Sequence, residues 1–166
     1  MNKNEILADL LGDKGQDRPN WIMRQLNKLA VMRILNDEKS HMDDVSKTVA
    51  AYNRFAAKNS KGKYDGTKLD EFYHKRAMYR AAQLGPDAAE YALWLGKKKE
   101  DWYDWPRNKY LRKYSDQKNE AEREKDLQNN RDAVIMSLQN PGVPVNEMIP
   151  HEGTTAGTFD IRFLRK

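Results

Sequence analysis

The sequence contains no cysteine, and this absence removes several kinds of site. Without thiols there is no disulfide framework, no thiolate zinc site and no cysteine nucleophile. A glycine-rich phosphate loop, the GxSxG turn of α/β-hydrolases and the HExxH zinc motif are also missing. The usual enzyme signatures are therefore absent, and we expect no cofactor.

Long apolar runs are missing as well. No stretch approaches the roughly 18 apolar residues of a membrane span, and the opening MNKNEILADLLG has no apolar segment of signal-peptide length. We therefore expect no membrane span and no secretion through a signal peptide.

Charged residues are plentiful and of both signs. Thirty Lys and Arg stand against 25 Asp and Glu, which gives a net charge of +5. The mean hydropathy is −1.00, yet four Trp, eight Tyr and four Phe are more aromatic residues than a disordered chain carries. A chain of 166 residues suits one domain. We expect a thin core under a charged surface.

Helical periodicity dominates residues 1–140 and predicts an all-α, compact bundle of about five to six helices. A short helix at 3–11 would be peripheral. The next is expected to start after Asn20, with Ile22, Leu26, Leu29, Ala30 and Ile34 on one stripe. Capping signals predict further helices from Ser40 and from Thr67, and Pro86 suits the first turn of another. The last helical stretch runs to Pro141, and its middle is almost entirely polar.

Residues 141–166 differ in character and are expected to form an extended tail. The stretch NPGVPVNEMIPHEGTTAG holds three prolines and three glycines. After it, Phe159, Ile161 and Phe163 alternate with polar residues, as in a half-buried strand. Such a tail either folds back on its own domain or adds a strand to a partner, with these three side chains docking.

Three separated stretches carry a recurring polar pattern: FYHKRAMYRAAQLG (72–85), LGKKKEDWYD (95–104) and KDLQNN (125–130). Across residues 69–133 the pattern resembles a loosely defined group of small helical domains found in bacteriophage proteins, toxin-like modules and some envelope-associated bacterial proteins. The matching positions are His74, Gly96, Lys99, Glu100, Asp104, Asp126, Leu127 and Asn130. The resemblance implies a helical domain but supplies no defined reaction.

The spacing of these residues allows a polar cluster. Glu100 and Asp104 lie one helical turn apart, as do Asp126 and Asn130. If their helices pack against that of His74, the cluster could act as a hydrolytic general acid and base, or hold a metal ion. It could instead be a buried hydrogen-bonded network that fixes how the helices cross. We favour the last hypothesis, in which His74 orients helix packing, and assign no catalytic or metal-binding residue.

Residues 94–114 interleave aromatic and basic side chains, which are the types that stack on bases and neutralise phosphates. The candidate nucleic-acid or partner-binding residues are Lys97, Lys98, Lys99, Trp102, Trp105, Arg107, Lys109, Arg112 and Lys113. No zinc-finger, RRM, KH or basic-zipper pattern accompanies them. The alternative is that the tryptophans belong to the core and the lysines form a solvated face.

The thin core, the polar last helix and a tail suited to docking on a partner indicate that the protein is a component of a larger assembly. With the resemblance, they predict a non-enzymatic bacteriophage virion or assembly component, such as a connector, portal-associated or packaged protein. It would dock by its helices and tail on neighbouring subunits, in multiple copies, in the virion or host cytoplasm. The alternatives are a nucleic-acid-binding accessory protein that uses residues 94–114, and a small hydrolase or toxin-like enzyme.

Overall fold

The computed structural model describes residues 5–6, 11, 21–58, 67–104, 110 and 116–149. Its main elements are α2 (Trp21–Lys58), α3 (Thr67–Ala82), α4 (Pro86–Lys99), the π-helix η1 (Glu100–Asp104), α6 (Asp116–Gln139) and α7 (Val145–Met148). All regular structure in these ranges is helical, so the predicted all-α bundle is confirmed. None of the helices in the same ranges carries an apolar run that could cross a bilayer.

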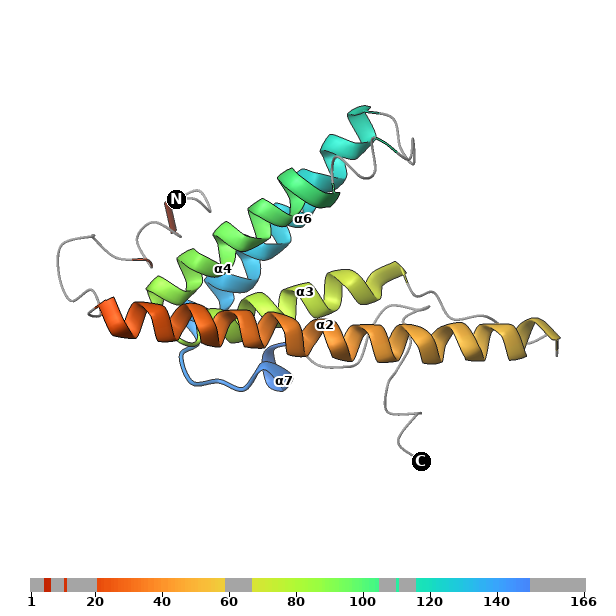
Figure 1. Ribbon diagram of the computed structural model, residues 1–166, viewed down its shortest axis with the longest axis horizontal. Helices are drawn as coiled ribbons and strands as arrows, with labels where there is room; N and C mark the ends of the chain where they lie inside the picture. Colours follow the sequence, from red (N-terminus) through yellow and green to blue (C-terminus); the bar gives the residue numbers. More distant parts are fainter. Residues whose placement is uncertain are drawn as a thin grey trace.

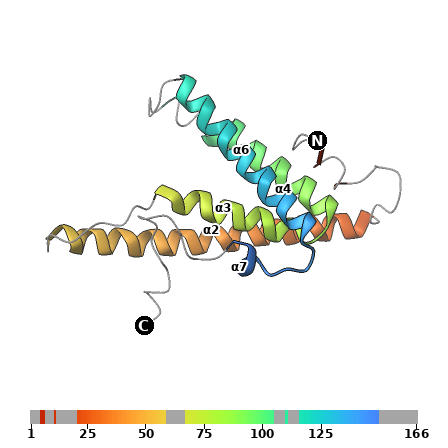
Figure 2. The same cartoon turned by 180° about the vertical axis from the view of Figure 1, so that it is seen from behind.

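The four long helices form two pairs. Helices α2 and α3 lie side by side, and α4 and α6 lie side by side and rise obliquely away from them (Figures 1 and 2). The pairs meet at the turn between α3 and α4, where Gly85 has a φ of 107° that favours glycine, and Pro86 begins α4. Away from this turn the two pairs diverge from each other, and the candidate site lies between them.

Helix α2 is one element of 38 residues, and the prediction of a new helix at Ser40 is wrong. Residues 21–58 contain neither glycine nor proline, so nothing in the sequence breaks the helix at Ser40. The capping signal there is the only feature that favours a new start. Glu38 and Val45, on either side of Ser40, are 1% and 8% exposed. A continuous helix buries both, and this packing outweighs the local signal.

Three of the five residues of the predicted apolar stripe of α2 face solvent and not the core. Ile22, Leu26 and Leu29 are 59%, 52% and 67% exposed, whereas Val31 is fully buried in the core. The first half of α2 therefore has apolar side chains on two opposite faces. Periodicity detects both faces and cannot tell which one packs.

The core is built mainly from small residues. Its larger cluster contains Val31, Met78, Ala81, Ala82, Ala88, Ala89, Ala92, Ala133 and Val134. A smaller cluster joins Val45 and Val49 of α2 to Leu69 and Tyr73 of α3. Alanines let helix axes approach closely, so a chain with few large apolar residues still buries a continuous interior.

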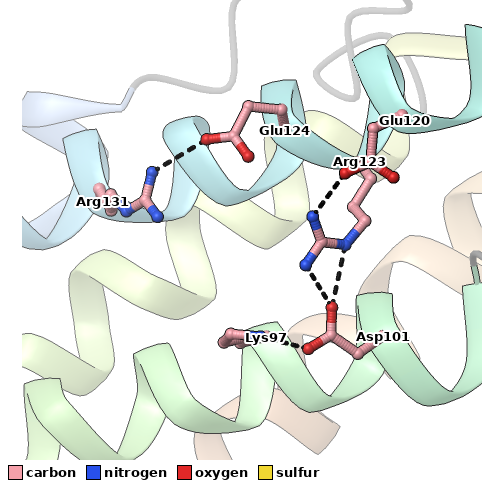
Figure 3. A network of polar contacts seen from close by, with 6 residues as sticks. All are labelled: Lys97, Asp101, Glu120, Arg123, Glu124 and Arg131. Carbon is pink, nitrogen blue, oxygen red and sulfur yellow. Dashed lines mark hydrogen bonds and ion pairs between the residues drawn. The ribbon is translucent and has the colours of Figure 1, made fainter. Parts of the chain in front are cut away.

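Ion pairs help to hold the polar first half of α6, in addition to the buried Leu127. Arg123 donates from Nε to Asp101 Oδ1 of η1 at 2.9 Å and from Nη1 to Glu120 at 2.9 Å (Figure 3). Lys97 contacts the other oxygen of Asp101. These hydrogen bonds hold the pKa of the Asp101 carboxyl below its usual value. The network thus fixes η1 against α6.

Residues 141–149 fold back on α3 and include the one-turn helix α7, although the sequence indicated an extended tail. Tyr79 Oη donates to Val143 O at 2.9 Å, and Arg76 Nη1 donates to Asn146 Oδ1 at 2.9 Å and Ile149 O at 3.3 Å. Gln83 Oε1 accepts from the Gly142 N–H at 2.7 Å. The predicted docking residues Phe159, Ile161 and Phe163 lie outside the described residues.

Candidate functional site

A cavity of about 370 Å³ lies between the two helical pairs and takes its walls from α2, α3, α4, η1 and α6. This volume is within the range of small-molecule sites, roughly 300–1,000 Å³. Its polar lining is Asn36, Glu38, Lys39, Asp70, Glu71, Tyr73, His74, Lys99, Glu100, Asp126, Asn129 and Asn130. Its remaining lining is Met32, Leu35, Met42, Ala77, Met78, Leu95 and Gly96. The cavity therefore combines polar groups with an apolar wall.

His74 Nε2 lies between a cation and an anion. Lys99 Nζ is 2.8 Å away, and Asp70 Oδ1, one turn earlier on α3, is 3.1 Å away. An ammonium only donates and a carboxylate only accepts, so the unprotonated nitrogen accepts from Lys99 and the protonated nitrogen donates to Asp70. The geometry thus offers a partner to both protonation states, which is what a group that takes up and releases a proton requires.

Asp126 of α6 is a carboxylic acid in the same cavity lining as His74. Burial raises the pKa of its carboxyl and the Asp70 charge adds to this, while Lys99 and His74 act in the opposite direction. A carboxyl with a raised pKa keeps its proton to a higher pH. The cavity therefore has a carboxyl of raised pKa in the same lining as His74.

Two neighbouring amides complete the α6 side of the cavity. Asn130 is 7% exposed and packs against Gly96, where an added Cβ would stand 2.7 Å from Asn130 Nδ2. The Asn129 Nδ2 atom is buried and finds no hydrogen-bond partner among the residues that the structure describes. An unmade buried hydrogen bond costs about 1–3 kcal/mol. Such a donor in a cavity wall is suited to a ligand oxygen.

Glu100 enters the cavity through a change in helix geometry. It is 6% exposed and is the first residue of the π-helix η1. Its Oε1 lies 3.8 Å from Lys99 Nζ. Short π-helical segments are frequent at functional sites because the extra residue per turn redirects side chains. The Asp104 side chain, another member of the predicted cluster, lies outside the described residues.

A buried ion pair supports the wall formed by α2 and α3. Arg76 Nε contacts Glu38 Oε2 at 3.2 Å, and Arg80 Nη1 contacts Glu38 Oε1 at 2.7 Å. Because Arg76 also binds residues 146 and 149, one guanidinium links the cavity wall to the C-terminal segment. The site is thus coupled to the segment that folds back on α3.

No group of three or more His, Cys, Asp and Glu side chains in the described part of the chain is arranged to hold a metal ion. A cation lies among these side chains, because the Lys99 ammonium is close to both His74 and Glu100.

The residues predicted to cluster do come together. His74, Glu100, Asp126 and Asn130 come from three helical segments and line one cavity. Asp70 and Asn129 were missed, although Asp70 stands four residues before His74, a spacing that places both on one helix face. The apolar wall from α2 had no sequence signal, because it depends on which face of α2 packs.

The described basic and aromatic residues of 94–114 divide between the cavity and the outer surface. Lys99 points to the cavity, and Lys97 pairs with Asp101. Trp94 and Trp102 are 52% and 75% exposed, so neither is a core residue. The candidate residues Trp105, Arg107, Lys109, Arg112 and Lys113 lie outside the described residues.

Comparisons of the chain with protein-family models, curated protein sequences and solved structures gave no match. The resemblance of residues 69–133 to phage and toxin-like domains therefore stays a prediction.

Proposed function

We propose that the cavity is the active site of a small hydrolase that works by general acid and base catalysis. The observation that carries this proposal is the position of His74 Nε2, 2.8 Å from Lys99 Nζ and 3.1 Å from Asp70 Oδ1, on the wall of a cavity. A residue that only orients helix packing would be expected in a filled interior.

Each polar group has a role in such a reaction. His74 takes a proton from water as the water oxygen bonds to the electrophilic centre of the substrate. Lys99 stabilises the negative charge that develops there, and Asp126 gives its proton to the leaving group. Burial raises the pKa of the Asp126 carboxyl, and an acid that keeps its proton to a higher pH suits this role.

The lining indicates the kind of substrate. Met32, Leu35, Met42 and Leu95 supply apolar lining, while Asn129 and Lys99 add polar groups to the lining of the same cavity. A substrate with an apolar body and a hydrolysable polar end matches both sides. The volume of about 370 Å³ suits a small molecule or a single side group of a polymer.

The test uses p-nitrophenyl probes: acyl esters of increasing chain length, a phosphodiester and a glycoside. We expect turnover of one class, and a fall of about 10²–10⁴-fold in kcat/KM in His74→Ala. His41→Ala, on the exposed side of α2, is the matched control and should keep full activity.

Melting temperatures separate the two interpretations of His74. A catalytic His74 can be replaced with little loss of stability, whereas a packing residue cannot. Absence of turnover with every probe, together with a clear fall in the melting temperature of His74→Ala, would return the residue to a structural role.

A second candidate function is docking in a bacteriophage virion or assembly. It is favoured by the solvent-facing stripe of Ile22, Leu26 and Leu29, which is bordered by the exposed cations Lys28 and Arg33. The partner that fits this surface is a subunit with an apolar groove and acidic rims. Sedimentation of the chain with phage structural proteins, compared with a Leu26→Lys and Leu29→Lys variant, tests it. Loss of co-sedimentation in the variant would support docking, and unchanged co-sedimentation would contradict it.

A further inference from the structure

A second surface lies on α4 and η1, next to the cavity but separate from it. Tyr91 and Trp94 stack with ring centroids 5.7 Å apart and an interplanar angle of 15°. Lys98 Nζ lies 5.7 Å from the Trp94 ring centroid and 4.5 Å from that of Trp102. At the other end, Lys28 Nζ lies 5.6 Å from the Tyr91 ring. Rings and ammonium groups thus alternate along one strip, which we name the aromatic ladder (Lys28, Tyr91, Trp94, Lys98 and Trp102).

The aromatic ladder is an exposed surface. Trp94 and Trp102 are 52% and 75% exposed, and large rings are seldom left so accessible without a function. Cation–π contacts hold the lysines beside the rings and give the strip a defined shape. Tyr91 covers one face of the Trp94 ring, and the remaining exposed ring surface of Trp94 and Trp102 is presented to solvent together with positive charge.

The surroundings favour an anionic partner. Two of the three carboxylates beside the ladder are engaged by cations, Asp87 by Arg24 at 3.2 Å and Asp101 by Arg123 and Lys97, while Glu90 is the third. Beside Tyr91 and Trp94 is a hollow of about 270 Å³, which is also lined by Arg24, Lys28, Asp87 and Glu90. The ladder therefore combines flat rings, two ammonium groups and a recess at one end.

We propose that the aromatic ladder binds single-stranded nucleic acid, with bases stacked on Trp94 and Trp102 and the phosphate backbone beside Lys98 and Lys28. Stacking needs unpaired bases, because the π-faces of a duplex are already covered. Positive charge between the rings neutralises the phosphates that connect successive bases. An acidic protein segment would use the charge but would leave the exposed Trp102 ring, and the Trp94 face that Tyr91 does not cover, without flat partners.

The experiment measures fluorescence anisotropy of a labelled oligothymidylate of about 12 nucleotides, a length within the site sizes of single-strand binders. Binding should weaken as salt rises from about 50 to 200 mM. Trp102→Ala and Trp94→Ala should each weaken it about 5- to 150-fold. Lys98→Ala should lower the slope of log K against log salt by about 0.7.

Two controls isolate the surface. Leu84→Ala removes an exposed apolar side chain outside the ladder, and Lys47→Ala removes an exposed cation on α2; both should bind like the wild type. His74→Ala changes the cavity and should also leave binding unchanged, so failure of the proposed hydrolase and failure of this proposal are distinguishable.

Three results would overturn the proposal. The first is no anisotropy change at about 50 mM salt. The second is binding that survives both tryptophan substitutions. The third is equal competition by polyglutamate or by duplex DNA, which would assign the ladder to polyanions in general or to an acidic protein.

Discussion

Gly96 of α4 and Asn130 of α6 are in such close contact that a Cβ atom on Gly96 would stand 2.7 Å from Asn130 Nδ2 and 3.1 Å from Met78 Cε. Both of these atoms are ends of side chains, so a Cβ at Gly96 requires the Asn130 amide or the Met78 methyl group to move. The same contact sets the position of Asn130 in the cavity wall.

Gly96→Ala should destabilise the protein. Helix propensity alone predicts a gain of about 1 kcal/mol, whereas displacing the Asn130 and Met78 side chains from their packed positions costs about 1–3 kcal/mol. We expect a net loss of up to about 2 kcal/mol in the free energy of unfolding, measured by urea denaturation. A more stable Gly96→Ala variant would show that Asn130 moves aside at no cost.

Asp126→Asn should stabilise the protein at neutral pH while removing activity. The folded-state pKa of Asp126 lies above its unfolded value, so the folded chain binds more protons between the two values. Stability from this group is present at low pH and is lost as pH rises through that window. The variant should therefore be more stable than the wild type above the folded pKa, and the difference should vanish below the usual aspartate pKa of about 3.9.

Asp101→Asn should change the stability of the protein in the direction opposite to Asp126→Asn. Hydrogen bonds from Lys97 and Arg123 lower the pKa of Asp101, so its contribution is present above the usual value and lost as pH falls through the folded value. This variant should be less stable than the wild type at neutral pH. Thermal melts of both variants across pH measure the two differences, and changes of the same sign would refute this assignment.

Glu38→Ala should be the most destabilising of these changes. Glu38 is 1% exposed and pairs with Arg76, which is 7% exposed. Removing one partner leaves a buried charge, at a cost of about 3–5 kcal/mol. The control is Asp44→Ala, whose exposed pair with Lys47 should contribute less than about 0.5 kcal/mol. Similar unfolding free energies for the two variants would contradict the burial of Glu38.

Gln83→Met should loosen residues 140–149 without unfolding the helices. Gln83 Nε2 donates to Ser137 and to Asn140 O, and its Oε1 accepts from the Gly142 N–H. Loss of these bonds should weaken the local contact by about 1–3 kcal/mol. Hydrogen exchange by peptide should show faster exchange at 140–149, with unchanged protection in α3. Unaltered exchange at 140–149 would mean that Tyr79 and Arg76 hold the segment by themselves.

The sequence by itself determined the helical class, because periodicity, capping residues and Pro86 act locally. It also located the start of α3 at Thr67 and that of α4 at Pro86. The one-turn spacings of Glu100 with Asp104 and of Asp126 with Asn130 placed each pair on one helix face, which suggested a cluster with His74 if the helices pack together. These inferences depend on neighbouring residues along one helix, where geometry is fixed by the backbone.

Only the tertiary structure decided which face of α2 packs, how the two helical pairs diverge and that the polar cluster lines a cavity. Ile22 and Val31 are both apolar, but only the contacts made by α3 and α4 bury Val31. Asn129 and Met32 likewise acquire their places in the wall from packing between distant segments. Local propensity contains no information about such contacts, since they depend on the free energy of the whole fold.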